Sequence, residues 1–222
     1  MSLKTTGLDE KLQGYLVENF SAEDDFLRKL ASDALIAGFP TIQISPEQTR
    51  FLQFLIKSIN AKNIIEIGTL FGYSTIAMAR ALPENGKLIS LELEPERAEF
   101  ARQKVAEAGL SDKVEIVCSK ALDFLVDFNP AEDLDFVFLD ADKNNYYKYV
   151  KILESRLRVG GMITADNAFA FGFILDSAPE RNPEDVKSIK SFNDFMNQHP
   201  NYLTTIAPVG DGLLMSLKLH NE

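Results

Sequence analysis

Short apolar runs alternate with helical stretches from Asn63 onwards, and this alternation constrains the fold more than any other feature of the chain. Strands that are apolar on both faces and separated by helices belong to parallel sheets with helices on both sides. The runs cover residues 64–67, 88–91, 114–117, 136–139 and 162–164. The helical stretches between them cover residues 73–82, 95–108, 121–128 and 145–158. We therefore predict an α/β fold built on a parallel sheet.

Two further apolar runs near the C-terminus predict that an antiparallel hairpin closes this sheet. They cover residues 203–207 and 213–218, they flank a glycine-rich turn at 208–212, and they follow a predicted helix over residues 184–197. Together with the five earlier runs, they predict a mostly parallel, seven-stranded sheet.

Helices are also predicted ahead of the sheet. Apolar residues recur at three- and four-residue steps over residues 8–20 and 23–38. A third helix follows Ser45, which is predicted to be its N-cap, with Pro46 at the first helical position. Gln48 stands where its side chain closes a capping box with Ser45.

The length and charge of the chain limit its possible functions. With 222 residues, 45% of them hydrophobic, we expect a single domain over residues 1–222, with N-terminal helices in 1–60 and the α/β core in 61–222. A net charge of −10 works against binding to nucleic acid. No apolar run is long enough to span a membrane, and residues 1–10 lack the pattern of a secretory signal. Cys118, the only cysteine, is expected to be a small core residue. These features predict a cytoplasmic protein.

The loop after the first run carries two glycines at a position where open parallel sheets bind ligands. Residues 66–74 are Glu-Ile-Gly-Thr-Leu-Phe-Gly-Tyr-Ser, and Gly68 and Gly72 allow the backbone to approach a ligand beside a helix N-terminus. The dinucleotide fingerprint has a third glycine, which this loop lacks. We therefore expect a nucleoside without a pyrophosphate.

An acidic residue ends the second run. Glu92 lies twenty residues beyond Gly72, where a carboxylate can accept hydrogen bonds from both ribose hydroxyls. Alternatively, Glu92 and Glu94 precede the helix that begins at Pro95 and are favoured there by the helix dipole.

Side chains with oxygen ligands follow the fourth and fifth runs. Asp140 comes after the fourth run, and Asp166 and Asn167 come after the fifth. In the strand order typical of such sheets these strands are neighbours, about 4.8 Å apart, so the three side chains can meet on one ion. A set with oxygen ligands alone suits a hard cation, Mg²⁺ first and Mn²⁺ or Ca²⁺ as alternatives, and disfavours zinc. Alternatively, the aspartates cap helices and the Asp-Asn pair forms a turn.

These motifs together resemble a known family. The loop at 66–74, the acidic end of the second run, Leu-Asp-Ala-Asp-Lys at 139–143 and the Asp-Asn pair look like the class I S-adenosylmethionine-dependent methyltransferases. Within that class they resemble the cation-dependent O-methyltransferases of the caffeoyl-coenzyme A and catechol type. The resemblance covers residues 42–218 and implies a Rossmann-like fold with S-adenosyl-L-methionine as methyl donor. The cofactor contacts that it implies are Ile44, Glu66, Gly68, Ser74, Glu92, Ala121, Asp140, Asp142 and Tyr149.

The resemblance also assigns the cation, the base and the acceptor. It places the divalent cation on Asp140, Asp166 and Asn167, so that Asp140 also acts in catalysis, and it identifies Lys143 as the residue that accepts the proton. The implied acceptor is a phenolic, catechol-like small molecule, because two vicinal hydroxyls on a divalent cation have a lowered pKa and a fixed orientation. The N-terminal helices resemble those that cover the site and contribute to a homodimer in this family.

Three phenylalanines follow the Asp-Asn pair and allow two interpretations. Phe169, Phe171 and Phe173 either pack on a flat aromatic acceptor or belong to the core or a lid. Phe171 stands where the plant members of the family have an asparagine that contacts substrate, so coenzyme A specificity is not carried over.

Two functions of other classes remain as alternatives. One is a NAD-dependent oxidoreductase on a similar sheet, which the missing third glycine disfavours. The other is a non-catalytic nucleoside-binding protein on the same fold, which the combination of Asp140, Lys143, Asp166 and Asn167 disfavours.

Overall fold

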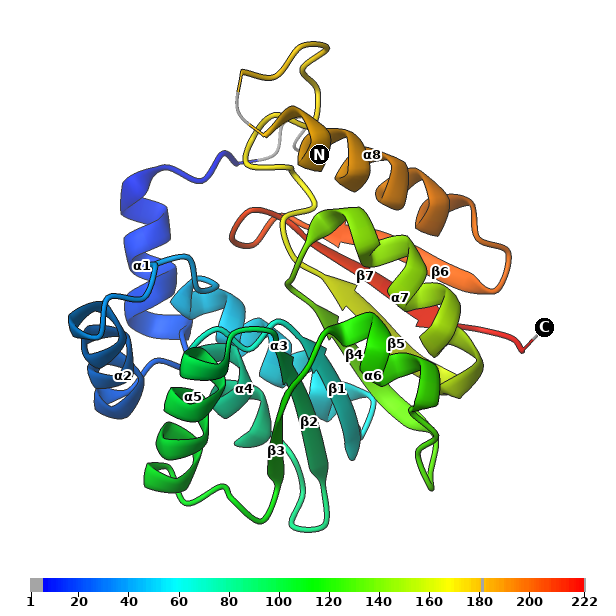
Figure 1. Ribbon diagram of the computed structural model, residues 1–222. Coiled ribbons are helices and arrows are strands. Elements are labelled where there is room, and N and C mark those ends of the chain that lie inside the picture. The colour runs from blue at the N-terminus through cyan, green and yellow to red at the C-terminus, as the bar shows by residue number, and fades with distance from the viewer. Residues whose placement is uncertain (1–5, 181, 222) are drawn as a thin grey trace.

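The computed structural model describes residues 6–180 and 182–221, which form a seven-stranded sheet with helices on both faces (Figure 1). The strand order is β3-β2-β1-β4-β5-β7-β6, and β7 runs antiparallel to β5 and β6. The predicted mostly parallel sheet with a C-terminal hairpin is therefore confirmed. Its strands are β1 (Asn63–Ile67), β2 (Lys87–Glu92), β3 (Val114–Cys118), β4 (Leu134–Leu139), β5 (Leu157–Ala165), β6 (Tyr202–Ala207) and β7 (Leu213–Lys218).

The helices are divided between the two faces of the sheet. Helices α2 to α5 share one hydrophobic core with the sheet, α6 to α8 share another, and α1 packs against α3. In the part of the chain that the structure describes, no helix is long and apolar enough to cross a membrane. The helices are α1 (Glu10–Phe20), α2 (Asp25–Ile36), α3 (Pro46–Ser58), α4 (Tyr73–Ala79), α5 (Pro95–Glu107), α6 (Ala121–Asp127), α7 (Tyr146–Leu153) and α8 (Pro183–Gln198).

The central strand β4 shows why the apolar runs predict a covered sheet. All six of its residues are buried, with Phe136 and Phe138 in the core beneath α2 to α5 and Val137 and Leu139 in the core beneath α6 to α8. Because side chains alternate along a strand, one between two apolar layers is apolar at successive positions.

The two N-terminal helices begin two residues later than predicted. An aspartate precedes each helix and caps it: Asp9 accepts a hydrogen bond from the Leu12 N–H, and Asp24 accepts one from the Leu27 N–H, both at 2.9 Å. A side chain that caps a helix in this way lies outside it.

Residues 1–5, 181 and 222 lie outside the described part of the chain. The interpretation of residues 1–10 as lacking a secretory signal therefore falls partly outside the described residues.

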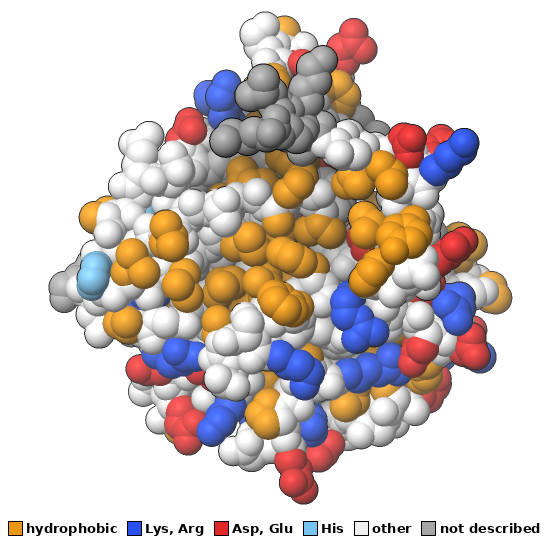
Figure 2. All heavy atoms as spheres, turned by 180° about the vertical axis from the view of Figure 1, so that it is seen from behind, with side chains coloured by type: hydrophobic (Ala, Val, Ile, Leu, Met, Phe, Trp, Pro, Cys, Tyr) orange, Lys and Arg blue, Asp and Glu red, His pale blue; other side chains and the backbone are white. Residues whose placement is uncertain are grey.

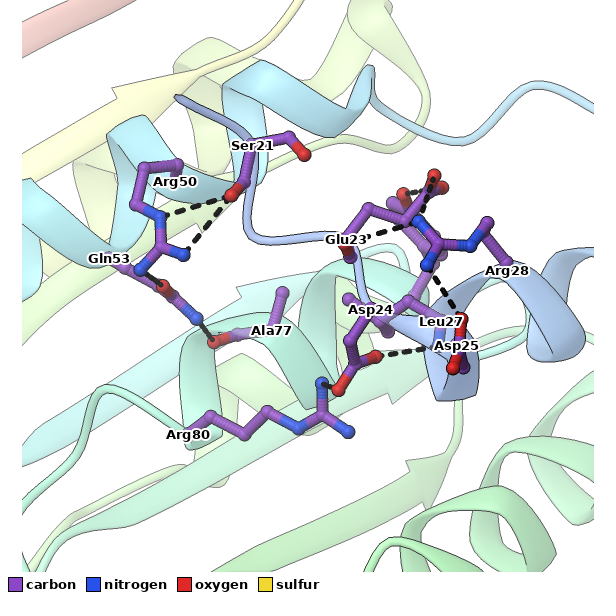
Figure 3. A network of polar contacts seen from close by, with 11 residues as sticks. Ser21, Glu23, Asp24, Asp25, Leu27, Arg28, Arg50, Gln53, Ala77 and Arg80 are labelled. Carbon is purple, nitrogen blue, oxygen red and sulfur yellow. Dashed lines mark hydrogen bonds and ion pairs between the residues drawn. The ribbon is translucent and has the colours of Figure 1, made fainter. Parts of the chain in front are cut away.

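Polar contacts fasten the connection between α1 and α2 onto α3 and α4 (Figure 3). Arg50 of α3 donates to the carbonyl oxygen of Ser21, and Arg80, which caps the C-terminus of α4, pairs with Asp24 at 3.0 Å. The hydroxyl of Tyr73, the first residue of α4, donates to Glu23 at 2.7 Å. The N-terminal helices are thus tied to the helix that follows the glycine loop.

The predicted capping box of α3 is wrong. Ser45 is the N-cap and Pro46 is the first helical residue, but the Ser45 side chain makes no capping hydrogen bond. The amide of Gln48 instead donates to the Asp166 carboxylate at 2.6 Å. A side chain engaged with the loop after β5 cannot also reach back to its own N-cap.

Two predictions about strand ends are also wrong. The helix expected over 145–158 ends at Leu153, and the strand expected over 162–164 begins earlier, at Leu157. The Gly160-Gly161 pair lies inside this strand, where the pairing of β4 with β5 is irregular. Cys118 is exposed, because it is the last residue of the edge strand β3.

Candidate active site

A pocket of about 740 Å³ lies at the carboxyl ends of β1, β2 and β4. Strand order reverses here, since β1 pairs with both β2 and β4, and open parallel sheets bind ligands at this position. The volume is typical of sites for small molecules. The predicted residues in its wall are Ile44, Gly68, Ser74, Glu92, Ala121, Asp140, Asp142, Lys143, Tyr149 and Asn167.

The glycine loop requires glycine at its first position for a steric reason. Gly68 has a φ of 102°, and a Cβ there would lie 2.0 Å from the carbonyl oxygen of Asp140. The backbone after β1 thus passes directly against the backbone after β4. Gly72, with a φ of 90°, is the N-cap of α4. These two glycines bring the loop and the start of α4 to the pocket.

Glu66 does not line the pocket, although it was predicted to contact the cofactor. It is fully buried, and its carboxylate accepts hydrogen bonds from Ser74 at 2.5 Å, Thr75 at 2.5 Å and Ser90 at 2.6 Å. Burial raises the pKa of Glu66 to about 7, although the three hydroxyl donors oppose the shift. Glu66 therefore joins α4 to β2, and Ser74 of this group reaches the wall.

Replacing Glu66 with glutamine is expected to remove a pH dependence of stability. Because the pKa of Glu66 is raised from 4.5 to about 7 on folding, its ionisation destabilises the folded state as the pH rises through this interval. The penalty reaches about 3 kcal/mol above the folded pKa, since one pKa unit corresponds to about 1.4 kcal/mol. Urea unfolding of both proteins between about pH 4 and pH 8 should show the wild type losing stability relative to Glu66→Gln.

Glu18→Gln, on the exposed surface of α1, is the matched control for removal of a carboxylate. The stability difference between this variant and the wild type should stay nearly constant over the same pH range. A difference between the wild type and Glu66→Gln that is equally constant would contradict the predicted role of burial.

Glu92 lies in the wall and is held by three backbone N–H groups. Its Oε2 accepts from Leu70 at 2.7 Å, and its Oε1 accepts from Leu93 and Glu94 at 3.0 Å. Because a carboxylate has about four acceptor positions, Glu92 can still accept from a ligand. Glu94 precedes α5 but makes no capping hydrogen bond. The geometry favours a positioned acceptor over a helix-dipole role for Glu92.

The side of the pocket after β4 carries a second ordered carboxylate. Asp142 accepts from the Tyr149 hydroxyl at 2.5 Å and from the Asn145 amide. Burial and this carboxylate raise the pKa of Tyr149, so its hydroxyl remains a donor at neutral pH. Ala121, at the start of α6, and Ile44, ahead of α3, supply apolar wall.

Asp140, Asp166 and Asn167 follow neighbouring strands, as predicted. Leu139 pairs with Ala165 in the register of β4 and β5, so the residues that follow each strand lie side by side. Burial and the charge of Asp140 raise the pKa of Asp166 to about 7. Asp140 and Asn167 line the pocket, whereas Asp166 lies behind the wall, hydrogen-bonded to Gln48.

This group of three fits a divalent cation. The buried carboxylate of Asp166 and the half-buried carboxylate of Asp140 repel each other, so a positive charge between them stabilises both, and a neutral amide oxygen completes a set that hard cations prefer. Among the described residues, no group of three histidine, cysteine or carboxylate side chains is arranged so that it could hold a metal ion. Any cation at the pocket would thus depend on the Asn167 amide as well as on Asp140 and Asp166.

Lys143 lies next to this group. Its Nζ is 3.2 Å from Asp140 Oδ1 and donates to the Tyr146 hydroxyl at 2.7 Å, and Tyr146 donates in turn to the Leu139 carbonyl oxygen at 3.0 Å. Burial lowers the pKa of Lys143, but Tyr146 and Asp140 more than offset this and raise it overall. Lys143 is therefore protonated beside Asp140. To act as a base it would need a lowered pKa, which requires another cation nearby.

The three phenylalanines differ in their surroundings. Phe171 lines the pocket and also packs against a small cluster that includes Ala170. The ring of Phe169 packs so closely on Gly212 that a Cβ there would lie 2.9 Å from it, and Phe173 packs in a small cluster with Ala170. Only Phe171 is thus placed to contact an acceptor.

Several residues at the site were not predicted. Tyr73, Leu93 and Arg97 also form wall; the sequence places them near the loops, but which way they face depends on packing. Gln48 and Asp211 contact the predicted cation ligands from behind. In the sequence, Gln48 belongs to a helix-capping motif and Asp211 to a hairpin turn. Both patterns have a local structural explanation, so neither indicates a role at the site.

Comparison with known proteins agrees with this geometry. A model of the O-methyltransferase family matches residues 18–219. The chain belongs to the O-methyltransferase family. A catechol O-methyltransferase from Niastella koreensis is 43% identical to this O-methyltransferase over 75% of the chain and 76% of the relative. A caffeoyl-CoA O-methyltransferase from Eucalyptus gunnii is 31% identical over 95% of the chain and 88% of the relative.

Solved structures of similar proteins add the cofactor class. An O-methyltransferase from Bacillus cereus, in complex with S-adenosylhomocysteine, has a TM-score of 0.85 and 32% identity, covering 94% of this chain and 97% of its own. One from Streptomyces achromogenes, in complex with S-adenosylmethionine, has a TM-score of 0.84 and 29% identity, covering 95% and 96%. The chain is thus an S-adenosylmethionine-dependent O-methyltransferase, and the matches support neither the oxidoreductase nor the non-catalytic alternative.

Proposed function

We propose that this O-methyltransferase uses a divalent cation, Mg²⁺ first and Mn²⁺ or Ca²⁺ as alternatives, and methylates a phenolic, catechol-like small molecule. The observation that carries the proposal is that Asp140 and Asn167 line the pocket beside the buried Lys143, with the buried Asp166 next to them behind the wall. Two relatives named catechol O-methyltransferase, from Niastella koreensis and Mycobacterium tuberculosis, support the class of acceptor.

The cofactor is proposed to occupy the part of the pocket around the glycine loop. Ser74 at the start of α4, Gly68 and Ile44 would contact its amino-acid end, and Glu92 would accept from the ribose hydroxyls. Ala121 would lie near the adenine, with Asp142 and Tyr149 completing that side of the wall. Glu66 would act indirectly, by holding Ser74.

The acceptor is proposed to lie between the cation ligands and Phe171. A divalent cation held by Asp140, Asp166 and Asn167 would lower the pKa of the acceptor hydroxyls and orient them. Lys143 is proposed to accept the phenolic proton at Nζ, a role that requires the charge of Asp140 to be balanced by another cation. Asp140 serves both halves of the site, since its backbone touches the cofactor loop at Gly68.

Methyl transfer to a panel of catechols, flavonoids and hydroxycinnamoyl esters, with Mg²⁺ and with EDTA, tests this proposal. We expect transfer to vicinal dihydroxy compounds, loss of transfer in EDTA and recovery on return of Mg²⁺ or Mn²⁺. Monohydroxy analogues are the matched control, because they lack the second oxygen for the cation. Full activity in EDTA would contradict the cation requirement, and methylation of monohydroxy analogues at an equal rate would contradict the chelating acceptor.

A homodimer is proposed from an apolar surface on the back of the molecule (Figure 2). Large apolar side chains that are exposed include Leu203 on β6, at 62%, and Phe54 on α3, at 66%. Large exposed apolar areas are typical of protein interfaces. A molar mass in solution equal to one chain at assay concentrations would contradict the dimer.

The remaining proposals concern organisation and place in the cell. We propose that residues 1–222 act as one catalytic domain, with helices in 1–60 and the α/β core in 61–222. We also propose that the enzyme acts in the cytoplasm on small molecules and does not bind nucleic acid, in keeping with its net charge of −10.

A further inference from the structure

Asp211, in the turn between β6 and β7, connects two parts of the proposed acceptor site. Its Oδ2 accepts a hydrogen bond from the Asn167 amide nitrogen at 3.1 Å and another from the Phe171 backbone N–H at 2.7 Å. The turn also pairs with the intervening chain through its backbone, because Ala168 N–H donates to the Gly212 carbonyl at 2.8 Å and Phe169 N–H donates to the Asp211 carbonyl at 2.9 Å. One carboxylate thus holds a predicted cation ligand and a pocket wall residue.

The chemistry of these groups decides which atom of Asn167 is left for a ligand. An ionised carboxylate can only accept hydrogen bonds, so the face that Asn167 presents to Asp211 has to be its NH₂ group. The amide oxygen then lies on the other branch of the side chain and is not used by this contact. Only the oxygen can ligate a hard cation. Without a fixed acceptor behind it, the amide can turn over and present its nitrogen.

The chain that Asp211 holds is conformationally strained. Asn167, Ala170 and Phe171 all have positive φ values, of 62°, 53° and 60°. Such conformations cost about 1 kcal/mol or more each for residues with a side chain and persist where the surrounding structure imposes them. The hydrogen bond from Phe171 N–H to Asp211 and the two backbone pairs are among the contacts that hold the segment, together with a hydrogen bond from Asn193 to the Ala168 carbonyl oxygen.

We propose that Asp211 is a positioning residue that sets the amide oxygen of Asn167 toward the pocket and fixes Phe171 beside it. The cation subsite and the aromatic wall of the acceptor subsite are then ordered by the same carboxylate oxygen. This inference rests on the proposed function for its cation half. Its other half, the order of the segment around Phe171, is independent of any cation.

Titration of Mn²⁺ into the wild type and into Asp211→Ala tests the cation half without an activity assay. We expect about 10- to 100-fold weaker Mn²⁺ binding in the variant, the usual effect of removing a partner that orients a ligand. In an Asn167→Asp background, which adds a carboxylate to the cation ligands, Asp211→Asn should weaken Mn²⁺ binding less than it does in the wild type, because the donor and acceptor are exchanged there while residue 167 still offers an oxygen. Affinity for S-adenosylhomocysteine should stay within about twofold in the variants changed at Asp211 alone, since Asp211 is not part of the pocket wall.

Thr205→Ala, an exposed position on β6 of the same hairpin, is the matched control and should bind Mn²⁺ like the wild type. If Asp211→Ala does not fold, Asp211→Asn can replace it. That variant keeps one acceptor for two donors, so its affinity for Mn²⁺ should be intermediate. Mn²⁺ affinity in a folded Asp211→Ala within about twofold of the wild type would overturn the inference. So would an equal loss of Mn²⁺ affinity from Asp211→Asn in the wild-type and the Asn167→Asp backgrounds.

A fluorescence measurement tests the other half. The chain has no tryptophan, so Phe171→Trp introduces a single reporter at the segment that Asp211 holds. Adding Asp211→Ala to this variant should shift the emission to the red and lower its anisotropy in metal-free buffer, whereas Thr205→Ala should change neither. An unchanged emission and anisotropy would overturn the inference. A wild type that binds no Mn²⁺ would contradict the proposed function, and the fluorescence would still decide the role of Asp211.

Discussion

Replacement of Gly68 by alanine is expected to weaken binding of S-adenosylhomocysteine at least about 100-fold and to destabilise the fold by about 2–5 kcal/mol. The new Cβ would lie 2.0 Å from the carbonyl oxygen of Asp140. This obstacle is backbone and cannot rotate away, so the loops after β1 and β4 have to separate. Both loops form the pocket wall, and the separation displaces Ser74 and Asp140 together.

Gly109→Ala is the matched control for this experiment. Gly109 also has a positive φ, of 69°, but no atom lies within 4 Å of the position of its Cβ. It should therefore show only the conformational cost, about 1 kcal/mol, and unchanged affinity for S-adenosylhomocysteine. Isothermal titration and urea unfolding measure both effects. If Gly68→Ala behaved like Gly109→Ala, the close approach of the two loops would be contradicted.

Replacement of Asp166 by asparagine is expected to lower turnover by about a thousandfold, because loss of a bound cation forfeits several kcal/mol of stabilisation in the transition state. The same change should not lower the stability of the folded protein in the absence of a cation. Burial and Asp140 raise the pKa of Asp166 to about 7, so above that pH the ionised carboxylate destabilises the folded state, and the neutral amide does not. The introduced amide would keep an oxygen to accept from Gln48.

Thermal unfolding with and without Mg²⁺ measures these opposite effects. At about pH 8 without a cation, the Asp166→Asn protein should melt no lower than the wild type, and added Mg²⁺ should raise the melting temperature of the wild type alone. Asp194→Asn, at an exposed position of α8, controls for the loss of a carboxylate. Equal stabilisation of the wild type and Asp166→Asn by Mg²⁺ would place the cation elsewhere, and unchanged turnover would remove Asp166 from catalysis.

The sheet was predictable because its signals are local. The run at 136–139 is apolar on both faces, and a strand of that kind is stable only between two layers of helices. The loop with Gly68 and Gly72 marks the carboxyl end of the first strand, and the Asp-Asn pair marks the end of the fifth. Since parallel strands end at one edge, their loops had to meet there.

The errors at single side chains arose where distant contacts replaced local ones. Ser45 and Gln48 have the spacing of a capping box, but Gln48 reaches 118 positions along the chain to Asp166. Asp211 belongs to an ordinary hairpin turn until β5 and β7 pair and bring the turn against Asn167. Glu66 was predicted in the wall, yet alternation along β1 places it beneath the loop, among three hydroxyls.

The sequence by itself determined the layered sheet, the order of its ligand-bearing loops and the kinds of side chain at each strand end. These follow from hydrophobic periodicity and from the conformations open to glycine, which act over a few residues. Tertiary structure decided which of those side chains face the pocket and which support it. That choice depends on contacts between residues 40 to 118 positions apart, such as Asp211 with Phe171 and Gln48 with Asp166, and no local pattern encodes them.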